Sequence, residues 1–140
     1  MRLELFINFD GNCREAAEFY ARVFRSKIGN LMTYAEAPPD PNHPVPQADR
    51  ERIMYAGVPI GGGVVMFSDV PAGSEFIAGN NLSPTVSTED KEEVARLYHE
   101  LKAGGEVCME LQQTFFSELF CMVKDQFGVT WQVLHYVPQA

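Results

Sequence analysis

The order of the secondary-structure signals constrains the fold of this chain more than any other feature. A stretch of alternating hydrophobicity at residues 3–9 precedes an amphipathic helix, and three further strand-like stretches follow. The same order then returns in the second half. Phe19-Tyr20 in the first expected helix and Leu97-Tyr98 in the second hold matching places. The sequence therefore predicts an α+β fold of paired βαβββ modules, at about residues 1–70 and 80–138.

Turn and capping signals mark where the two helices begin. Asp10-Gly11 indicates a turn, Asn12 is expected to cap the first helix, and Glu15 is placed to bond back to the Asn12 amide. Thr88 is expected to cap the second helix, which has an acidic first turn. The remaining strands are expected at residues 27–35, 52–58, 63–67, 82–87, 107–111, 119–124 and 129–136.

The composition is typical of one globular domain in a reducing compartment. A chain of 140 residues suits a single domain at 1–140. Its net charge of -8 disfavours nucleic acid and anionic membranes as partners, because the surface would repel phosphate. Cys13, Cys108 and Cys121 form no CxxC pair, and no apolar run approaches the roughly 20 residues that span a bilayer. We therefore expect a soluble cytoplasmic protein.

Alternation along the strands also indicates which side chains are free to meet a ligand. Residues of one parity, such as Phe9 and Trp131, are expected to pack under the helices, so residues of the other parity face away. That second face suits a ligand pocket, and it equally suits a solvated sheet face or a dimer surface. The polar or soft side chains expected there are Glu4, Asn8, Met66, Thr130 and Gln132.

Six stretches that span nearly the whole chain carry a resemblance to a known family. They are INFDGNCREA at residues 7–16, KDQFGVTW at 124–131, and residues 19–20, 52–54, 79–81 and 109–122. On these stretches the sequence resembles the PhnB-like branch of the glyoxalase/bleomycin resistance/dioxygenase (vicinal oxygen chelate) superfamily. The resemblance implies paired βαβββ modules, each curling around a concave cavity, in a homodimer. Some members are labelled 3-demethylubiquinone methyltransferases, but the glycine run at 61–63 precedes a strand rather than a helix.

The resemblance also implies where a divalent metal ion would bind. Metal-dependent relatives use His and Glu on four strands, at positions that correspond here to about Glu4, Met66, Ser83 and Gln132. Of these, only Glu4 is a strong ligand for a divalent first-row ion. A complete metal site is therefore disfavoured, no cofactor is expected, and Glu4 is left as a candidate general base.

Two departures from the family pattern fall where the family places its cavity. Tyr55 stands where relatives often have histidine, and it is a candidate pocket hydroxyl or an ordinary strand aromatic. Phe116 stands where they often have tryptophan, and it is a candidate ligand contact, lid or dimer anchor. His135 is interpreted as a structural histidine. Cys121 is expected to be an inert buried thiol, whereas Cys13 could be activated by the helix start.

These observations leave three functions open. The first is a protein that binds a small-molecule ligand in the concave cavity without a complete metal site. The second is a divalent-metal-dependent lyase, isomerase or dioxygenase of the same superfamily. The third is a structural homodimer without a ligand. One scaffold hosts unrelated chemistries, so the fold does not choose among them, and the weak set of metal ligands favours the first.

Overall fold

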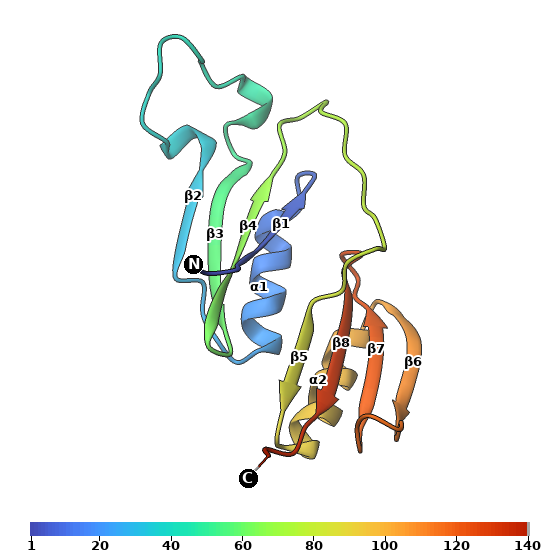
Figure 1. Ribbon diagram of the computed structural model, residues 1–140. Helices are drawn as coiled ribbons and strands as arrows, with labels where there is room; N and C mark the ends of the chain where they lie inside the picture. The colour runs from blue at the N-terminus through green and yellow to red at the C-terminus, as the bar shows by residue number, and fades with distance from the viewer. Residues whose placement is uncertain (140) are drawn as a thin grey trace. The chain divides into compact units, whose positions relative to one another are not determined.

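The computed structural model describes residues 1–139, and the chain divides into two compact units, Met1–Ile77 and Ala78–Ala140. In its described part, each unit contains one α-helix and one four-stranded mixed sheet (Figure 1). The predicted order of strand, helix and three strands is confirmed in both units, whereas the single domain at 1–140 stays a prediction. Neither α-helix has the length and apolar character that a bilayer crossing requires.

The first unit has the strand order β1-β4-β3-β2. The edge strand β1 runs parallel to β4, and the other two pairings are antiparallel. Two short 3-10 helices lie in the proline-rich segment between β2 and β3. The elements are β1 (Leu5–Phe9), α1 (Cys13–Val23), β2 (Asn30–Thr33), η1 (Tyr34–Glu36), η2 (Gln47–Asp49), β3 (Ile53–Ile60) and β4 (Gly63–Asp69).

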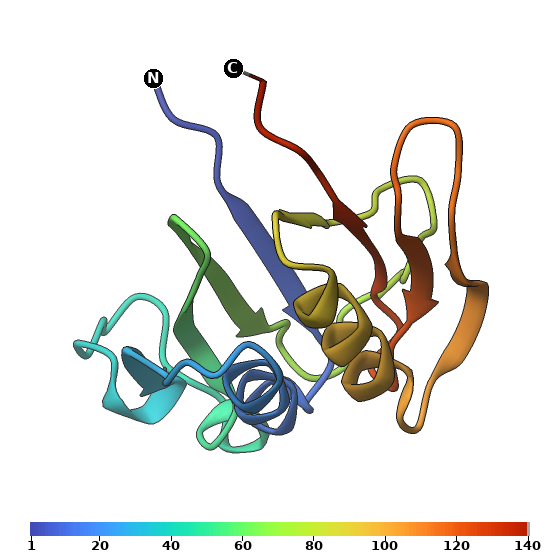
Figure 2. The ribbon, with the colours of Figure 1, turned by 90° about the horizontal axis from the view of Figure 1, so that it is seen from below.

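Alternate side chains of these strands pack against α1, which lies on one face of its own sheet (Figure 2). Phe67 is fully buried and stacks on Tyr20 of the helix, with ring centroids 5.4 Å apart. Ala56 is its neighbour in the β3–β4 ladder and is also fully buried. In β1, Phe9 is buried and Phe6 is exposed. Burying a large apolar side chain stabilises the fold by about 1.5–3 kcal/mol, so the alternation of core-facing and outward-facing positions is strongly favoured over a register shifted by one residue.

A buried carboxylate holds the start of α1. Asp69, the last residue of β4, is 1% exposed, and its Oδ1 accepts hydrogen bonds from the amides of Gly11 and Cys13 at 2.8 and 3.0 Å. Its Oδ2 accepts from the amide of Ile53 at 2.9 Å. Asn12 occupies the N-cap position as predicted, but its side chain makes no capping hydrogen bond, and the Asp69 carboxylate accepts from the first helical amide instead.

The second unit has the strand order β5-β8-β7-β6. Here β5 is the edge strand that runs parallel to its neighbour β8, and the other pairings are antiparallel. The helix packs on one face of this sheet, as in the first unit (Figure 2). The elements are β5 (Thr85–Thr88), α2 (Lys91–Lys102), β6 (Glu106–Gln112), β7 (Phe120–Lys124) and β8 (Thr130–His135).

The last strand alternates strictly between core and open face, as predicted. The buried residues of β8 are Trp131, Val133 and His135, and the half-buried ones are Thr130, Gln132 and Leu134. A second buried carboxylate supports this strand: Asp125 accepts from the indole Nε1 of Trp131 at 2.8 Å. Its other oxygen accepts from the amides of Phe127 and Val129, so the turn before β8 is held from inside.

Several expected element starts are wrong. β2 begins at Asn30 and not at residue 27, and β5 begins at Thr85 and not at residue 82. β1 begins at Leu5 and not at residue 3, because pairing with β4 begins at Leu5, and Leu3 is 99% exposed. The cap of α2 is Asp90, whose Oδ1 accepts from the Glu92 amide at 2.9 Å. Thr88 instead ends β5, and its hydroxyl accepts from the Asp90 amide.

Beyond α2 the backbone passes very close to β7. A Cβ added at Gly105 would lie 2.2 Å from the carbonyl oxygen of Lys124. Glycine is therefore required at this approach, where a side chain would collide with backbone rather than with a movable side chain.

Candidate functional site

In the first unit, the sheet face away from α1 brings polar and apolar side chains together. The β1–β4 register places Phe6 beside Met66 and Asn8 beside Ser68. The Ser68 hydroxyl donates to Asn8 Oδ1 at 3.2 Å, and Met66 is half-buried. A thioether next to an amide suits a ligand with both apolar and polar groups.

Tyr55 extends this face onto β3. Its hydroxyl lies so close to Gly57 that a Cβ added at Gly57 would be 3.0 Å from it and 3.3 Å from Val64. Gly57 is the ladder partner of Met66, so the Tyr55 ring lies on the same face as Met66. The structure therefore brings three predicted ligand-binding residues, Asn8, Tyr55 and Met66, onto one face of the first sheet.

Glu4, the candidate general base, lies just before β1 and outside the ladder. Its carboxylate is exposed and forms an ion pair with Arg2 at the start of the chain. Its catalytic role stays a prediction, and the solvated ion pair weighs against it.

In the second unit, Gln132 lies at the centre of the face away from α2. Its ladder neighbours are Met122 on β7 and Thr85 on β5, and it is itself half-buried. Thr130 follows the same parity and pairs with Lys124 at the end of the ladder. These side chains form a second mixed surface, with an amide at its centre.

Exposed aromatic residues flank this second surface. Phe115 is 100% exposed and Phe116 is 55% exposed. Their rings make an edge-to-face contact, with ring centroids 5.2 Å apart. Phe116 makes the same kind of contact with Phe120 at 5.2 Å, and Phe120 is the ladder partner of Leu134. Phe116 therefore lies at the rim of the open face, where ligand contact and dimer contact are both feasible.

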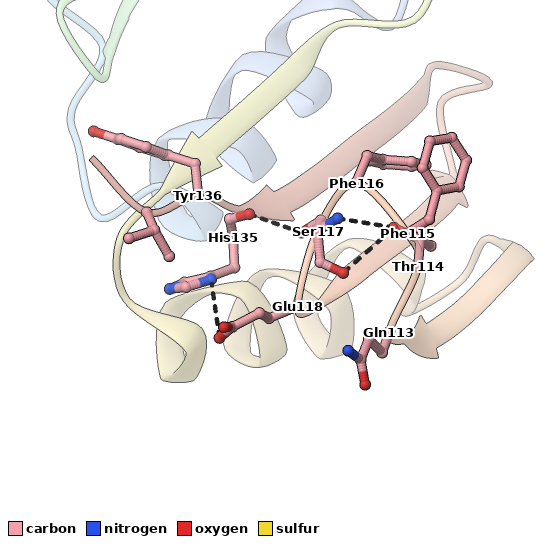
Figure 3. A pocket seen from close by; sticks show the side chains of 9 residues that line it. Gln113, Thr114, Phe115, Phe116, Ser117, Glu118, His135 and Tyr136 are labelled. Carbon is pink, nitrogen blue, oxygen red and sulfur yellow. Dashed lines mark hydrogen bonds and ion pairs between the residues drawn. The ribbon is translucent and has the colours of Figure 1, made fainter. Parts of the chain in front are cut away.

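A pocket of about 380 Å³ opens beside Phe116 in the second unit, between residues 113–118 and the end of β8 (Figure 3). Its lining includes Phe116, Glu118, His135 and Tyr136. Ser117 fixes the segment in place, because its buried hydroxyl donates to the His135 carbonyl at 2.7 Å. Unlike Gln132, His135 projects to the helix side of the sheet. Its ring Nε2 lies 3.0 Å from a backbone carbonyl oxygen, in line with the structural role predicted for this histidine.

Strong metal ligands do not gather in the part of the chain that the structure describes. Among residues 1–139, no three His, Cys, Asp or Glu side chains lie together as a set that could hold an ion. The positions that correspond to the metal-dependent relatives hold Glu4 and Met66 in the first unit, and Ser83 and Gln132 in the second. A divalent first-row ion takes several imidazole, carboxylate or thiolate ligands. The residues present therefore do not fit the metal of those relatives.

The three cysteines are free, and two of them are buried. Burial raises the pKa of Cys13 to about 12, and the nearby Asp69 carboxylate adds to the shift. Burial also raises the pKa of Cys121 to about 11. The expectation of an inert Cys121 is supported, whereas activation of Cys13 by the helix start is contradicted, because desolvation and Asp69 outweigh the helix dipole.

Two sheets, each with one helix on one face, define a known class of protein. A glyoxylase/bleomycin resistance protein/dioxygenase domain from Frankia sp. EAN1pec aligns with 100% of this chain and 95% of its own length, with a TM-score of 0.68. Its sequence identity is only 12%, so the likeness shows the fold alone. The predicted class, an α+β fold of glyoxalase/bleomycin resistance type, is confirmed.

The chain belongs to the PhnB-like family, because the family model described as 3-demethylubiquinone-9 3-methyltransferase matches residues 2–134. It is 31% identical over 140 residues to Protein YjdN of Escherichia coli (strain K12), across 95% of this chain and 94% of that protein. The structure of PA1353 from Pseudomonas aeruginosa is similar with a TM-score of 0.86, 28% identity and coverage of 96% and 97%. The PhnB protein from Bacillus cereus has a TM-score of 0.79, 26% identity and coverage of 97% and 100%. The predicted family is confirmed.

Sequence reasoning missed several residues of these sites. Ser68 and Met122 follow the parity of Met66 and Gln132, so consistent alternation would have found them. The approach of Glu118 to His135 had no such signal, because the contact depends on how residues 113–118 fold back onto β8.

Proposed function

We propose that the chain binds a small molecule with both polar and apolar groups on the sheet faces that its helices leave uncovered, without a resident metal ion. The observation that carries this proposal is the half-buried Gln132 amide, set between Met122 and Thr85. A solvated sheet face does not require a thioether beside a central amide. A ligand-binding surface does, because a few polar groups fix the orientation of the ligand while apolar contacts supply the binding energy.

The enzyme alternatives have weaker support. A metal-dependent lyase, isomerase or dioxygenase needs a set of strong ligands that residues 1–139 do not bring together. The methyltransferase in the family description is not carried over, because the glycine run at 61–63 joins β3 to β4 and does not open a helix as a nucleotide-binding loop does.

A thermal-shift screen of a small-molecule library tests the proposal. A ligand present at about 100 times its Kd stabilises the folded state by about 2.7 kcal/mol. For a chain of this size, that raises Tm by roughly 5–10 °C. The Gln132→Ala variant should lose most of the shift, whereas Gln126→Ala, in the exposed turn before β8, should keep it. A broad library without any shift, or an equal shift in both variants, refutes the proposal.

The absence of a resident metal ion is tested separately. Elemental analysis of protein purified without chelators should give far less than one divalent ion per chain, and added zinc, nickel, manganese or iron should not raise Tm. A stoichiometric ion would favour the metal-dependent enzyme instead.

We also propose that the chain forms a homodimer in the cytoplasm. The exposed pair Phe115 and Phe116 supports association, because adjacent exposed aromatic rings are typical of contact surfaces. Free Cys13, Cys108 and Cys121 suit a reducing compartment. Light scattering should give a dimer for the native chain and a monomer for Phe116→Asp. If that monomer keeps ligand binding, Phe116 is a dimer anchor and not a ligand contact.

A further inference from the structure

No methionine lies in the core of either unit. Within residues 1–139, none of the six methionines is among the buried hydrophobic residues. Methionine is a common filler of irregular gaps in cores, but branched aliphatic and aromatic side chains dominate both cores of this chain. All six methionines are exposed or half-buried instead, so reagents in solution can reach their side chains.

In the second unit, two methionines lie side by side on the sheet face away from α2. Met109 of β6 is the ladder partner of Met122 on β7, and Met122 is in turn the partner of Gln132. Directly paired residues of antiparallel strands point to the same side of a sheet, with their Cβ atoms about 4.5–5.5 Å apart. Met109 is 37% exposed and Met122 is half-buried. The two thioethers therefore border the amide at the centre of the proposed ligand surface.

The first unit also has two methionines on its open face. Met32 of β2 is the ladder partner of Tyr55, whose ring lies on the same face as Met66. Met32 and Met66 are both half-buried. Of the remaining two methionines, Met1 precedes the first strand and Met54 forms no ladder pair within residues 1–139. We refer to the four that lie on the sheet faces away from the helices as the open-face methionines: Met32, Met66, Met109 and Met122.

A hydroperoxide changes a methionine side chain in a defined way. The sulfur lone pair takes the terminal oxygen of the peroxide, the O–O bond breaks, and the thioether becomes a sulfoxide while water or an alcohol leaves. The sulfur is oxidised by two electrons and the peroxide is reduced by two. Methionine sulfoxide reductases reverse the change, because two thiols form a disulfide as the sulfoxide oxygen leaves as water.

Oxidation at these four positions would alter the ligand surface and leave the core unchanged. A sulfoxide is polar, whereas the thioether it replaces is apolar and flexible. An apolar part of a ligand that covered the sulfoxide oxygen would strip it of water without offering it a hydrogen-bond donor. The buried residues that hold each helix on its sheet include no thioether, so the fold itself has no methionine to lose.

We propose that oxidation of the open-face methionines by a hydroperoxide switches off ligand binding, and that reduction of the sulfoxides restores it. This regulation rests on the proposed function, because it acts on the same sheet faces.

The fluorescence of N-phenyl-1-naphthylamine, an aromatic amine that becomes bright in apolar surroundings, tests the proposal with the full chain. Treatment with hydrogen peroxide should weaken binding of this probe at least about tenfold, because the contact surface becomes polar. Methionine sulfoxide reductases supplied with a dithiol should restore the original affinity. Peptide mass spectrometry locates the sulfoxides, and circular dichroism in urea should give the same unfolding midpoint before and after oxidation.

The matched control replaces all four open-face methionines by leucine, a change that nearly conserves volume. This variant keeps Met1, Met54 and the three cysteines, so it reports any effect of oxidation away from the open faces. Its affinity for the probe should be the same before and after peroxide. The single variant Met122→Leu should keep part of its affinity after peroxide, because Met122 borders Gln132.

Four results overturn the proposed regulation. They are open-face methionines that stay reduced while the fully exposed Met1 is oxidised, unchanged affinity after the four sites are oxidised, an equal loss of affinity in the leucine variant, and a loss of binding that accompanies a lower urea midpoint. Failure of the proposed function gives a different result. An untreated chain that binds neither the probe nor any library compound refutes that function, and its regulation falls with it.

Discussion

Replacing Asp69 by asparagine tests how the first unit is held together. The side chain keeps its size but has only one acceptor oxygen, whereas Asp69 accepts three backbone amides through two oxygens. The asparagine oxygen can retain the bonds from Gly11 and Cys13, and its NH2 group then faces the Ile53 amide. One buried donor loses its partner, and the two remaining bonds lose the charge of their acceptor. Together these changes should lower the free energy of unfolding by about 2–4 kcal/mol.

Urea denaturation followed by circular dichroism measures this loss. With a slope of about 1–3 kcal/mol per molar urea, the midpoint should fall by roughly 1–2 M. Total stabilities are about 5–15 kcal/mol, so the variant stays folded and measurable. The single tryptophan, Trp131, reports on the second unit, so its fluorescence shows whether that unit unfolds in the same transition.

Asp40→Asn is the matched control. The Asp40 carboxylate is exposed and accepts from the Asn42 amide at 2.9 Å, so its replacement should change stability by less than about 0.5 kcal/mol. A loss below about 1 kcal/mol in Asp69→Asn would refute the reasoning, because it would mean that the three amides do not depend on the carboxylate.

Two further predictions concern the cysteines and one close backbone approach. At mildly alkaline pH a thiol reagent should modify the exposed Cys108 quickly. Cys13 and Cys121 should react only after unfolding, because both thiols are buried and have raised pKa values. Mass spectrometry of native and urea-treated protein measures the modification of each cysteine. Gly105→Ala should lower stability by more than about 2 kcal/mol because its Cβ would collide with the carbonyl at the end of β7. Gly62→Ala, which meets nothing within 4 Å, should be nearly neutral in the same urea assay.

The strand and helix order could be predicted because it rests on local patterns. Parity in β8 places Trp131 in the core and Gln132 on the open face, since a slip by one residue would reverse both. The start of β1 and the partner of the first amide of α1 could not be predicted in the same way. Pairing with β4 decides where β1 begins, and the partner of the first helical amide is Asp69, 56 residues away.

The candidate sites differ in the same way: some of their residues follow from local alternation, and others depend on contacts between segments. Residues such as Met66 and Gln132 follow from alternation within one strand, so the sequence was enough to place them on their faces. The pocket beside His135 depends instead on a loop. Ser117 ties that loop to the end of β8 through a hydrogen bond to a backbone carbonyl, and no periodicity in the sequence encodes such a contact.

The alternation of β8 separates the positions that the protein needs to fold from the positions on its open face. Every second position of this strand touches the interior, and the intervening positions meet whatever lies outside. Mutations at Thr130, Gln132 and Leu134 can therefore accumulate without disturbing Trp131 or its bond to Asp125. A lineage with this strand can change the chemistry of its open face by point substitutions, while its interior stays as it was.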